Sequence, residues 1–300
     1  MGKKSILVTG SNGLLGQKIV NQLKNRPDVD LIATSKGANR RLVQDFNYIS
    51  LDITSEKEVS ETMEKYKPDV VINTAAMTNV DACEDNQNEC WDINVRAVGY
   101  LLKESIRHNS HLIHLSTDFV FDGKNGPYKE TDEPNPLSYY AKSKVASEEL
   151  ISSSDYKNTA IARTIIVFGT GDNLSRGNLV LWAKGALEKQ SPINVVDDQY
   201  RAPTLAEDLA KGCISIADKN ARGIFHLSGP ETMSILEIVK RIAGFYNLSS
   251  DCVTPIKTTT LNQTAARPPR TGFVIEKANK ELDYHPLDLE QALHFLRDQI

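Results

Sequence analysis

The chain has 300 residues, of which 40% are hydrophobic and 25% are charged, and its formal net charge is −4. These values are typical of a folded protein with one large domain or two small ones, so they argue against a disordered, collagen-like or disulfide-dense chain. The balance of charge is weakly acidic, and no block of five basic residues occurs. A nucleic-acid partner is therefore not expected, because the sequence has no basic patch to neutralise a phosphate backbone.

Apolar runs in the sequence are short. A membrane span needs roughly 18 consecutive apolar residues, and the amino terminus passes directly into an expected strand without room for a secretory signal. We therefore expect a cytoplasmic protein with no membrane partner. The cysteines form no C-x-x-C pair, so we interpret them as reduced, mostly buried thiols and expect no metal site. They are Cys83, Cys90, Cys213 and Cys252.

The first half of the chain alternates short β-branched runs with longer helical stretches, as repeated βαβ units around a parallel sheet do. Strands are expected over 5–9, 29–35, 48–51, 70–74, 112–117 and 160–167, and helices over 14–25, 55–66, 86–108 and 140–153. Because the strands are apolar on both faces, they belong in a sheet that is covered on both sides. The predicted fold class is α/β, a Rossmann-like doubly wound parallel sheet with a smaller C-terminal substrate-binding lobe.

Beyond residue 170 the alternation becomes irregular. We predict a nucleotide-binding domain over 1–170, to which about 203–226 also contribute. Residues 171–300 are predicted to form mainly the second lobe, which would supply the other wall of a cleft.

Three glycines lie between the first expected strand and the first expected helix, in Gly10-Ser-Asn-Gly-Leu-Leu-Gly16. Glycines here let the backbone turn tightly and approach a pyrophosphate, which the N–H groups of the helix start would face. The spacing alone could be ordinary turn chemistry, but a strand before it and a helix after it form the context of a dinucleotide-binding turn. The residues predicted to bind the cofactor are Gly10, Ser11, Asn12, Gly13, Leu14, Leu15 and Gly16.

The end of the second strand discriminates between nicotinamide cofactors, because a carboxylate there would bind a free ribose 2′-hydroxyl. The sequence has Thr34-Ser35-Lys36 at this point, with Arg40 and Arg41 nearby. Cations would suit a 2′-phosphate, so NADPH is favoured and NADH stays open. The alternative is that these charges are solvated loop residues. We predict cofactor contacts at Ser35 and Lys36, and contacts to the adenine at Asp52 and Ile53.

Tyr140 and Lys144 are four residues apart on an expected helix and therefore share one face of it. A neighbouring ammonium is expected to lower the pKa of the phenol, which could then exchange a proton with a carbonyl or alcohol oxygen. Thr117 ends the fifth strand, and its hydroxyl points to the same crevice. We predict Thr117, Tyr140 and Lys144 as the catalytic residues.

Several longer motifs carry a resemblance to a known family. They are the glycine turn and the segments 73–81 (NTAAMTNVD), 116–123 (STDFVFDG), 136–144 (PLSYYAKSK) and 198–204 (DQYRAPT). Together they resemble the extended short-chain dehydrogenase/reductase superfamily and, within it, the dTDP-4-dehydrorhamnose reductase family. The likeness runs from Ile6 to Pro268.

The resemblance implies an oxidoreductase of dTDP-L-rhamnose biosynthesis that uses NADPH to reduce C4 of a nucleotide-linked 4-keto-6-deoxy sugar. It implies that Tyr140 donates the proton, that Lys144 also bonds to the nicotinamide ribose, and that Thr117 orients the substrate oxygen. Tyr140 and Lys144 would thus contact the cofactor as well. Further residues implied to line the cofactor are Ala75, Ala76 and Thr78, and Asp118 is implied to contact the sugar.

Three positions depart from the family pattern. Ile166 replaces a tryptophan that packs near the sugar, so it is a candidate substrate contact with a different wall. Ala141 replaces a glycine after the catalytic tyrosine, and Leu174 replaces a phenylalanine. None of these is the proton donor, so reductase chemistry is expected to survive while the sugar and the nucleotide stay open.

Two alternatives remain. One is a non-catalytic nucleotide-binding regulatory subunit, similar to the methionine adenosyltransferase regulatory subunit, and the other is a reductase or epimerase of another small carbonyl substrate. The intact set of Thr117, Tyr140 and Lys144 favours an enzyme. A homodimer stays open.

One histidine and two acidic pairs are interpreted as structural residues without a role in catalysis. His226 is expected in the core, and the acidic pairs Glu84-Asp85 and Glu148-Glu149 are expected to face solvent.

Overall fold

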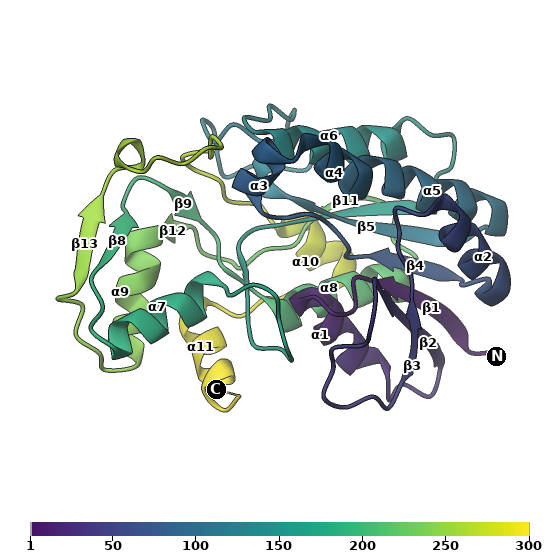
Figure 1. Cartoon of the computed structure of the whole chain (residues 1–300), viewed down its shortest axis with the longest axis horizontal. Coiled ribbons are helices and arrows are strands. Elements are labelled where there is room, and N and C mark those ends of the chain that lie inside the picture. The colour runs from purple at the N-terminus through teal and green to yellow at the C-terminus, as the bar shows by residue number, and fades with distance from the viewer. Residues whose placement is uncertain (1, 300) are drawn as a thin grey trace.

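A seven-stranded parallel sheet forms the centre of the larger lobe in this computed structural model, which describes residues 2–299 (Figure 1). Its strand order is β11-β6-β5-β4-β1-β2-β3. The strands are β1 (Lys4–Thr9), β2 (Val29–Ser35), β3 (Asn47–Ser50), β4 (Val70–Asn73), β5 (His111–Thr117), β6 (Thr159–Thr164) and β11 (Gly223–His226). The predicted Rossmann-like α/β fold is confirmed.

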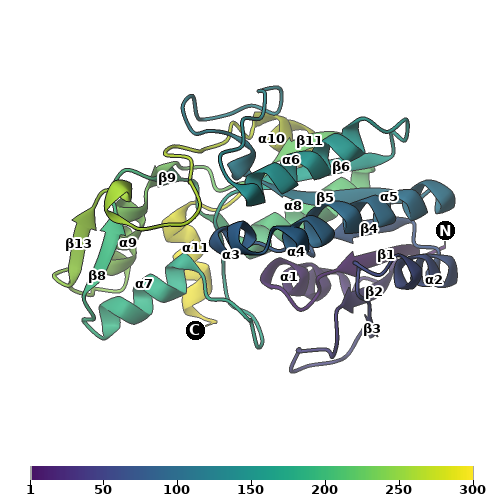
Figure 2. The same ribbon diagram turned by 45° about the horizontal axis from the view of Figure 1, so that its top comes forward.

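The sheet separates two layers of helices. This is seen along strand β1, whose side chains alternate between two hydrophobic clusters, one on each face. Ile6 and Val8 pack with α1 (Leu14–Leu23), α8 (Ala206–Lys219) and α10 (Glu276–Leu282). Leu7 points to the other face, where it packs with α2 (Glu56–Tyr66), α5 (Ala97–His108) and α6 (Tyr139–Ser152). Figure 2 shows α5 and α6 on the same side of the sheet.

The order of the strands reverses between β1 and β4, which is where parallel α/β sheets open a crevice for ligands. The two strands pair from Ile6 with Val70 to Thr9 with Asn73, so both end at one level. There the Thr9 hydroxyl donates to Asn73 Oδ1 over 2.6 Å. The carboxyl ends of β1, β4 and β5 are thus available to build a site.

The smaller lobe has its own hydrophobic core and lies at the left of Figure 1. Helices α7 (Leu179–Glu188), α9 (Ile235–Phe245) and α11 (Leu289–Arg297) form most of it. Its strands pair as β8 (Ile193–Val196) with β13 (Val253–Ile256), and as β9 (Tyr200–Arg201) with β12 (Met233–Ser234). The predicted boundary at residue 170 stays a prediction, and the chain returns to the large sheet at β11 and α10.

The helix predicted over 86–108 is not continuous. It consists of α4 (Gln87–Trp91), a π-helical turn over Asp92–Arg96 and α5, and it is preceded by the short α3 (Val80–Asp85). Asn94 lies in the π turn and is buried, where it exchanges two hydrogen bonds with the backbone of Met77. The π turn therefore has a structural role, because it places Asn94 where its side chain satisfies the N–H and carbonyl groups of Met77.

The strand predicted over 160–167 ends at Thr164. Ile166 has a φ of 28°, which a β-branched residue rarely adopts, so the strand direction changes there. The next residues form the separate strand β7 (Val167–Phe168), which pairs with β10 (Thr204–Leu205). Single 3-10 turns occur at Asp118–Val120 and Thr258–Thr260. None of the helices within residues 2–299 has the length and apolar character that crossing a membrane requires.

Candidate active site

The turn between β1 and α1 needs glycine at two of its three glycine positions. Gly10 has a φ of 66°, and a Cβ there would lie 2.7 Å from the backbone nitrogen of Ala75. A Cβ on Gly16 would lie 2.3 Å from the carbonyl oxygen of Gly10. Gly13 has an ordinary φ of −80° and begins α1 without a side-chain cap. The turn therefore packs tightly on itself and on the end of β4, and it leaves the first N–H groups of α1 free for a ligand.

A groove runs over the carboxyl ends of the central strands. Its larger cavity, of about 570 Å³, and its smaller one, of about 310 Å³, share Gly13, Thr74, Ala76 and Ser175 as lining residues. The predicted residues in the larger cavity are Gly13, Leu14, Leu15, Gly16, Ala76, Thr78, Thr117, Asp118, Tyr140, Lys144 and Ile166. Those in the smaller one are Gly10, Asn12, Gly13, Ser35, Lys36, Asp52, Ile53, Ala75 and Ala76.

Among the described residues, only Ser11 of the predicted set lines neither cavity. It is buried in the turn, and its N–H donates to the carbonyl oxygen of Thr34 over 2.9 Å. The structure therefore brings the predicted residues to one groove with this exception. Their contacts with a cofactor stay predictions.

The cations near the end of β2 differ in availability. Arg41 is buried, and its Nε lies 3.0 Å from Asp172 Oδ2, so it holds a neighbouring loop and does not line the groove. Lys36 is exposed and pairs with Asp52 Oδ2 at 2.7 Å. Arg40 lines the smaller cavity together with Lys36. The expectation that three cations await a 2′-phosphate is thus reduced to two.

Tyr140 lies in the first turn of α6, whose start is fixed by two side chains. Ser138 caps the helix by accepting from the N–H of Ala141 over 3.3 Å. Glu84 Oε1 accepts from the N–H of Tyr139 over 2.7 Å. Glu84 is therefore half-buried and structural, and the expectation that it faces solvent is wrong. Both contacts order the backbone that presents the phenol.

Burial dominates the acidity of Tyr140. The side chain is only 8% exposed, and burial raises its pKa above the usual value, while the Thr117 hydroxyl acts in the opposite direction. The expectation that Lys144 lowers this pKa is wrong for this structure. The Lys144 ammonium instead donates to the carbonyl oxygen of Leu115 over 2.6 Å and lies 3.1 Å from Nε2 of His114. The phenol is therefore protonated at neutral pH.

Lys144 is itself perturbed. Burial lowers its pKa to about 8, against the opposing charge of Glu148. The pKa of His114 lies well below its usual value, because the ring is buried and the ammonium is close. His114 is consequently neutral near pH 7, and Lys144 is the group of this pair that carries charge.

Thr117 and Asp118 are held from the smaller lobe. The Thr117 hydroxyl donates to Asp118 Oδ1 over 3.1 Å. Asp118 Oδ2 accepts from the Thr271 hydroxyl and lies 3.7 Å from Nε of the buried Arg201. The predicted contact of Asp118 with a sugar stays a prediction, but these bonds give its carboxylate a second role in fixing the Thr117 side chain in the wall of the cavity.

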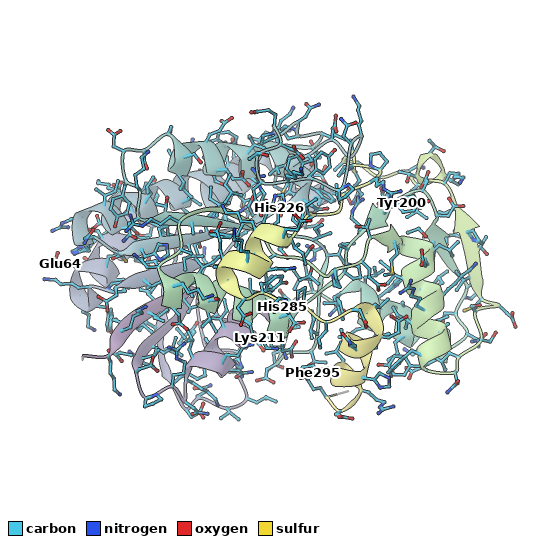
Figure 3. All side chains as sticks on the ribbon, turned by 180° about the vertical axis from the view of Figure 1, so that it is seen from behind. Glu64, Tyr200, Lys211, His226, His285 and Phe295 are labelled. Carbon is cyan, nitrogen blue, oxygen red and sulfur yellow. The ribbon has the colours of Figure 1, made fainter. Side chains whose placement is uncertain are left out.

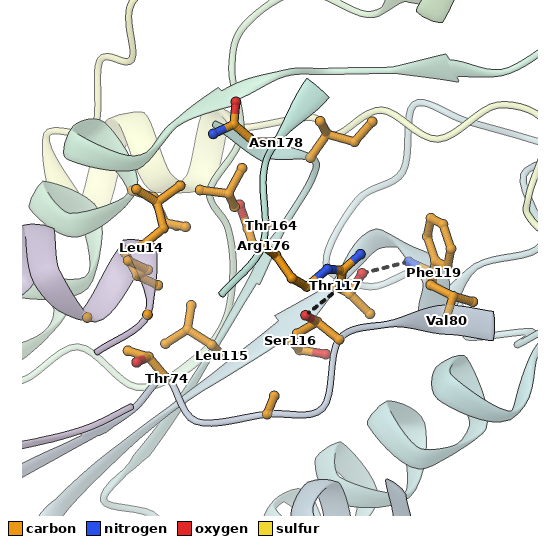
Figure 4. A pocket seen from close by; sticks show the side chains of 18 of the residues that line it. Leu14, Thr74, Val80, Leu115, Ser116, Thr117, Phe119, Thr164, Arg176 and Asn178 are labelled. Carbon is orange, nitrogen blue, oxygen red and sulfur yellow. Dashed lines mark hydrogen bonds between the residues drawn. The ribbon is translucent and has the colours of Figure 1, made fainter. Parts of the chain in front are cut away.

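Other residues of the larger cavity were not predicted. The hydroxyls of Ser116 and Thr164 are buried, line the cavity and have no hydrogen-bond partner within residues 2–299. Such groups need a ligand or water to complete their bonding. Arg176 and Asn178 also line the cavity, and Figure 4 shows Arg176 extending toward Thr117. Ser116 stands inside a motif that was recognised, whereas nothing in the sequence pattern singles out Arg176.

Arg163 of β6 and Glu148 of α6 form a buried ion pair. Arg163 Nη2 lies 2.6 Å from Glu148 Oε2, and Nε lies 3.0 Å from Oε1. The expectation that Glu148 faces solvent is wrong, because β6 brings a buried guanidinium to it. His226 lies in the core as expected, stacked on Phe273 with its Nδ1 3.1 Å from the carbonyl oxygen of Tyr128. Figure 3 shows it beside α10.

The comparisons with known proteins agree with this geometry. A family model described as the RmlD substrate binding domain matches residues 4–299. The chain belongs to this family. The resemblance to the dTDP-4-dehydrorhamnose reductases and to the extended short-chain dehydrogenases is thereby confirmed.

Individual relatives of this RmlD family member differ in what they do. It is 32% identical to the dTDP-4-dehydrorhamnose reductase of Aggregatibacter actinomycetemcomitans, over 97% of this chain and 98% of the relative. It is 33% identical to methionine adenosyltransferase 2 subunit beta of Danio rerio, over 88% of this chain and 81% of the relative. Its fold matches the dTDP-4-dehydrorhamnose reductase of Bacillus anthracis str. Ames, solved in complex with NADP, with a TM-score of 0.85, 25% identity and coverage of 99% and 100%.

Proposed function

We propose that this protein is an NADPH-dependent reductase of a nucleotide-linked 4-keto-6-deoxy sugar, with hydride delivered to C4 and Tyr140 as the proton donor. The observation that carries the proposal is the position of Tyr140. Its buried phenol lines the same cavity as Thr117, Lys144 and the glycine turn. A proton donor and a dinucleotide-binding turn facing one groove are what carbonyl reduction with a nicotinamide cofactor requires.

The groove fits the cofactor. Gly10 and Gly16 stand where a Cβ would clash with the turn itself or with the end of β4, so only glycine allows this tight turn beside the groove. The free N–H groups at the start of α1 suit the pyrophosphate. At the other end, Arg40 and Lys36 suit a 2′-phosphate, and β2 itself ends without a carboxylate, while the nearby Asp52 pairs with Lys36. When bound, NADPH supplies the hydride.

The residues of the chain would handle the proton and the charge. Because its pKa is raised, Tyr140 stays protonated at neutral pH and can donate to the oxygen at C4 as negative charge develops there. Thr117 lies next to the phenol and would hold the same oxygen in line. The Lys144 ammonium adds positive charge from a buried position, where such charge acts strongly on a developing alkoxide.

The test is a direct assay with purified protein, NADPH and dTDP-4-dehydrorhamnose. We expect NADPH to be oxidised as the reduced sugar nucleotide forms. The oxidation is measured as the loss of NADPH absorbance. Parallel assays with UDP- and GDP-linked 4-keto-6-deoxy sugars identify the nucleotide. Failure to oxidise NADPH with any of these sugars would overturn the proposal.

A second candidate is a regulatory subunit of a methionine adenosyltransferase, supported by the 33% identity to the Danio rerio protein. Retention of Thr117, Tyr140 and Lys144 in one cavity favours the reductase, since a purely binding protein has no use for this set. The two candidates separate when the protein is mixed with a methionine adenosyltransferase catalytic subunit. Altered kinetics of that enzyme, with no reduction of any keto sugar, would establish the second candidate instead.

The rate of reduction is expected to depend on pH through Lys144. As pH rises through about 8, the ammonium loses its proton, so kcat/KM should be level near pH 7 and fall up to about tenfold per unit above pH 8. His114 adds no change in this window because it is already neutral. The measurement is a pH profile of kcat/KM with saturating NADPH. The Lys144→Arg variant, whose charge persists, should have lower activity without this fall, and a level profile to pH 10 in the unaltered protein would contradict the assignment.

A further inference from the structure

The larger cavity contains a cation with no charged partner. Three of its lining residues are charged, namely Asp118, Lys144 and Arg176. Asp118 is bonded to Thr271 and lies near Arg201, and Lys144 donates to a backbone carbonyl. Within residues 2–299, the one hydrogen bond of the Arg176 guanidinium is to a neutral group, from Nη1 to the Thr78 hydroxyl over 3.1 Å. The positive charge of Arg176 is therefore available to a ligand in the groove.

The loop that carries Arg176 is tied down on both sides. Gln17 of α1 exchanges two hydrogen bonds of 2.8 Å with the backbone of Asp172, whose carboxylate pairs with Arg41. On the other side, Asn178 begins α7, and its side chain donates to the carbonyl oxygen of Gly169 over 2.8 Å. The loop of residues 172–178 thus leaves the larger lobe and enters the smaller one directly beside the groove.

Residues 175 and 176 complete the wall of the groove on the side of the loop of residues 172–178. Ser175 lines both cavities, and Arg176 reaches from the loop before α7 to Thr78, which lies in the loop after β4. A ligand in the larger cavity would lie under this crossing. It would meet the exposed guanidinium at this crossing.

Guanidinium groups bind phosphate oxygens through two parallel N–H donors, with more directional contact than an ammonium offers. In the function proposed above, both ligands of the groove, NADPH and the nucleotide sugar, contain a diphosphate. We propose that Arg176 binds the diphosphate of a groove ligand and so fastens the loop of residues 172–178 across the site. This role rests on the proposed function.

The experiment compares Arg176→Gln, which removes the charge, with Arg176→Lys, which keeps it without the paired donors. Lys189→Gln is the matched control, because Lys189 is an exposed cation at the far end of α7 and its loss changes the net charge equally. Dissociation constants are measured by titration for NADPH and for dTDP. Two probes without a diphosphate, adenosine 2′,5′-bisphosphate and thymidine, are titrated alongside them.

We expect Arg176→Gln to weaken NADPH or dTDP about tenfold or more, Arg176→Lys to weaken the same ligand less, and Lys189→Gln to change neither. Weaker NADPH alone assigns the diphosphate to the cofactor, and weaker dTDP alone assigns it to the substrate. Binding of both ligands unchanged in Arg176→Gln, or equal weakening of the probes without a diphosphate, would overturn the role of Arg176. If the unaltered protein binds NADPH but not dTDP, the proposed substrate is wrong, while the NADPH titration still decides the role of Arg176.

Discussion

Replacing Tyr140 with phenylalanine is expected to lower kcat for the reduction about 100- to 10,000-fold, the range over which a general acid contributes. The ring should keep its place, because it packs with Cys83, Cys90 and Phe119 and its packing does not depend on the hydroxyl. The Kd of NADPH should therefore change by less than about threefold. The measurement is steady-state kinetics together with titration of the cofactor.

Tyr139→Phe is the matched control for this variant. Tyr139 is the preceding residue of α6, is half-buried and packs beside Trp91, outside the two cavities. It also loses one phenolic hydroxyl, so its rate should stay close to that of the unaltered protein. Turnover by Tyr140→Phe at a near-normal rate would disprove the assignment of the proton donor, whatever the substrate.

The parts of the fold that could be predicted are those that short, local sequence patterns indicate. Strands buried on both faces, such as β1 and β4, contain short continuous apolar runs, and the glycine turn is recognised by its position between a strand and a helix. The π turn at Asn94 could not be predicted in this way. The bonds that hold it come from the backbone of Met77, which lies 17 residues earlier in the loop after β4 and outside the helix.

In the candidate site, too, local patterns predict some residues, whereas other properties depend on the tertiary structure. Tyr140 and Lys144 could be found because their spacing on a helix is a local property, but the pKa of Tyr140 could not, since it depends on how completely other elements bury the phenol. Arg176 escaped prediction because its meaning depends on where a loop between two lobes crosses the groove. Asp118 was recognised by motif, yet its bonds to Thr271 and Arg201 exist only through the return of the chain from the smaller lobe.

The buried pair of Glu148 and Arg163 provides the largest expected effect on stability. Glu148→Ala should lower the free energy of unfolding by about 3–5 kcal/mol, because it leaves the guanidinium charged and buried without its partner. Both side chains of the pair are almost fully shielded, with 5% and 2% of their surface exposed. Urea unfolding followed by circular dichroism measures the change as a lower midpoint at a similar slope.

Two variants separate the charge effect from simple truncation. Glu149→Ala removes the neighbouring exposed carboxylate of the same helix and should change stability by less than about 0.5 kcal/mol. Glu148→Leu combined with Arg163→Leu removes both charges and should recover much of the loss, since an apolar pair has no buried charge to compensate. Equal destabilisation by the double variant and by Glu148→Ala would mean that the shape of these side chains, and not the unpaired charge, determines the cost. In that event the pair would contribute mainly by filling the space between α6 and β6.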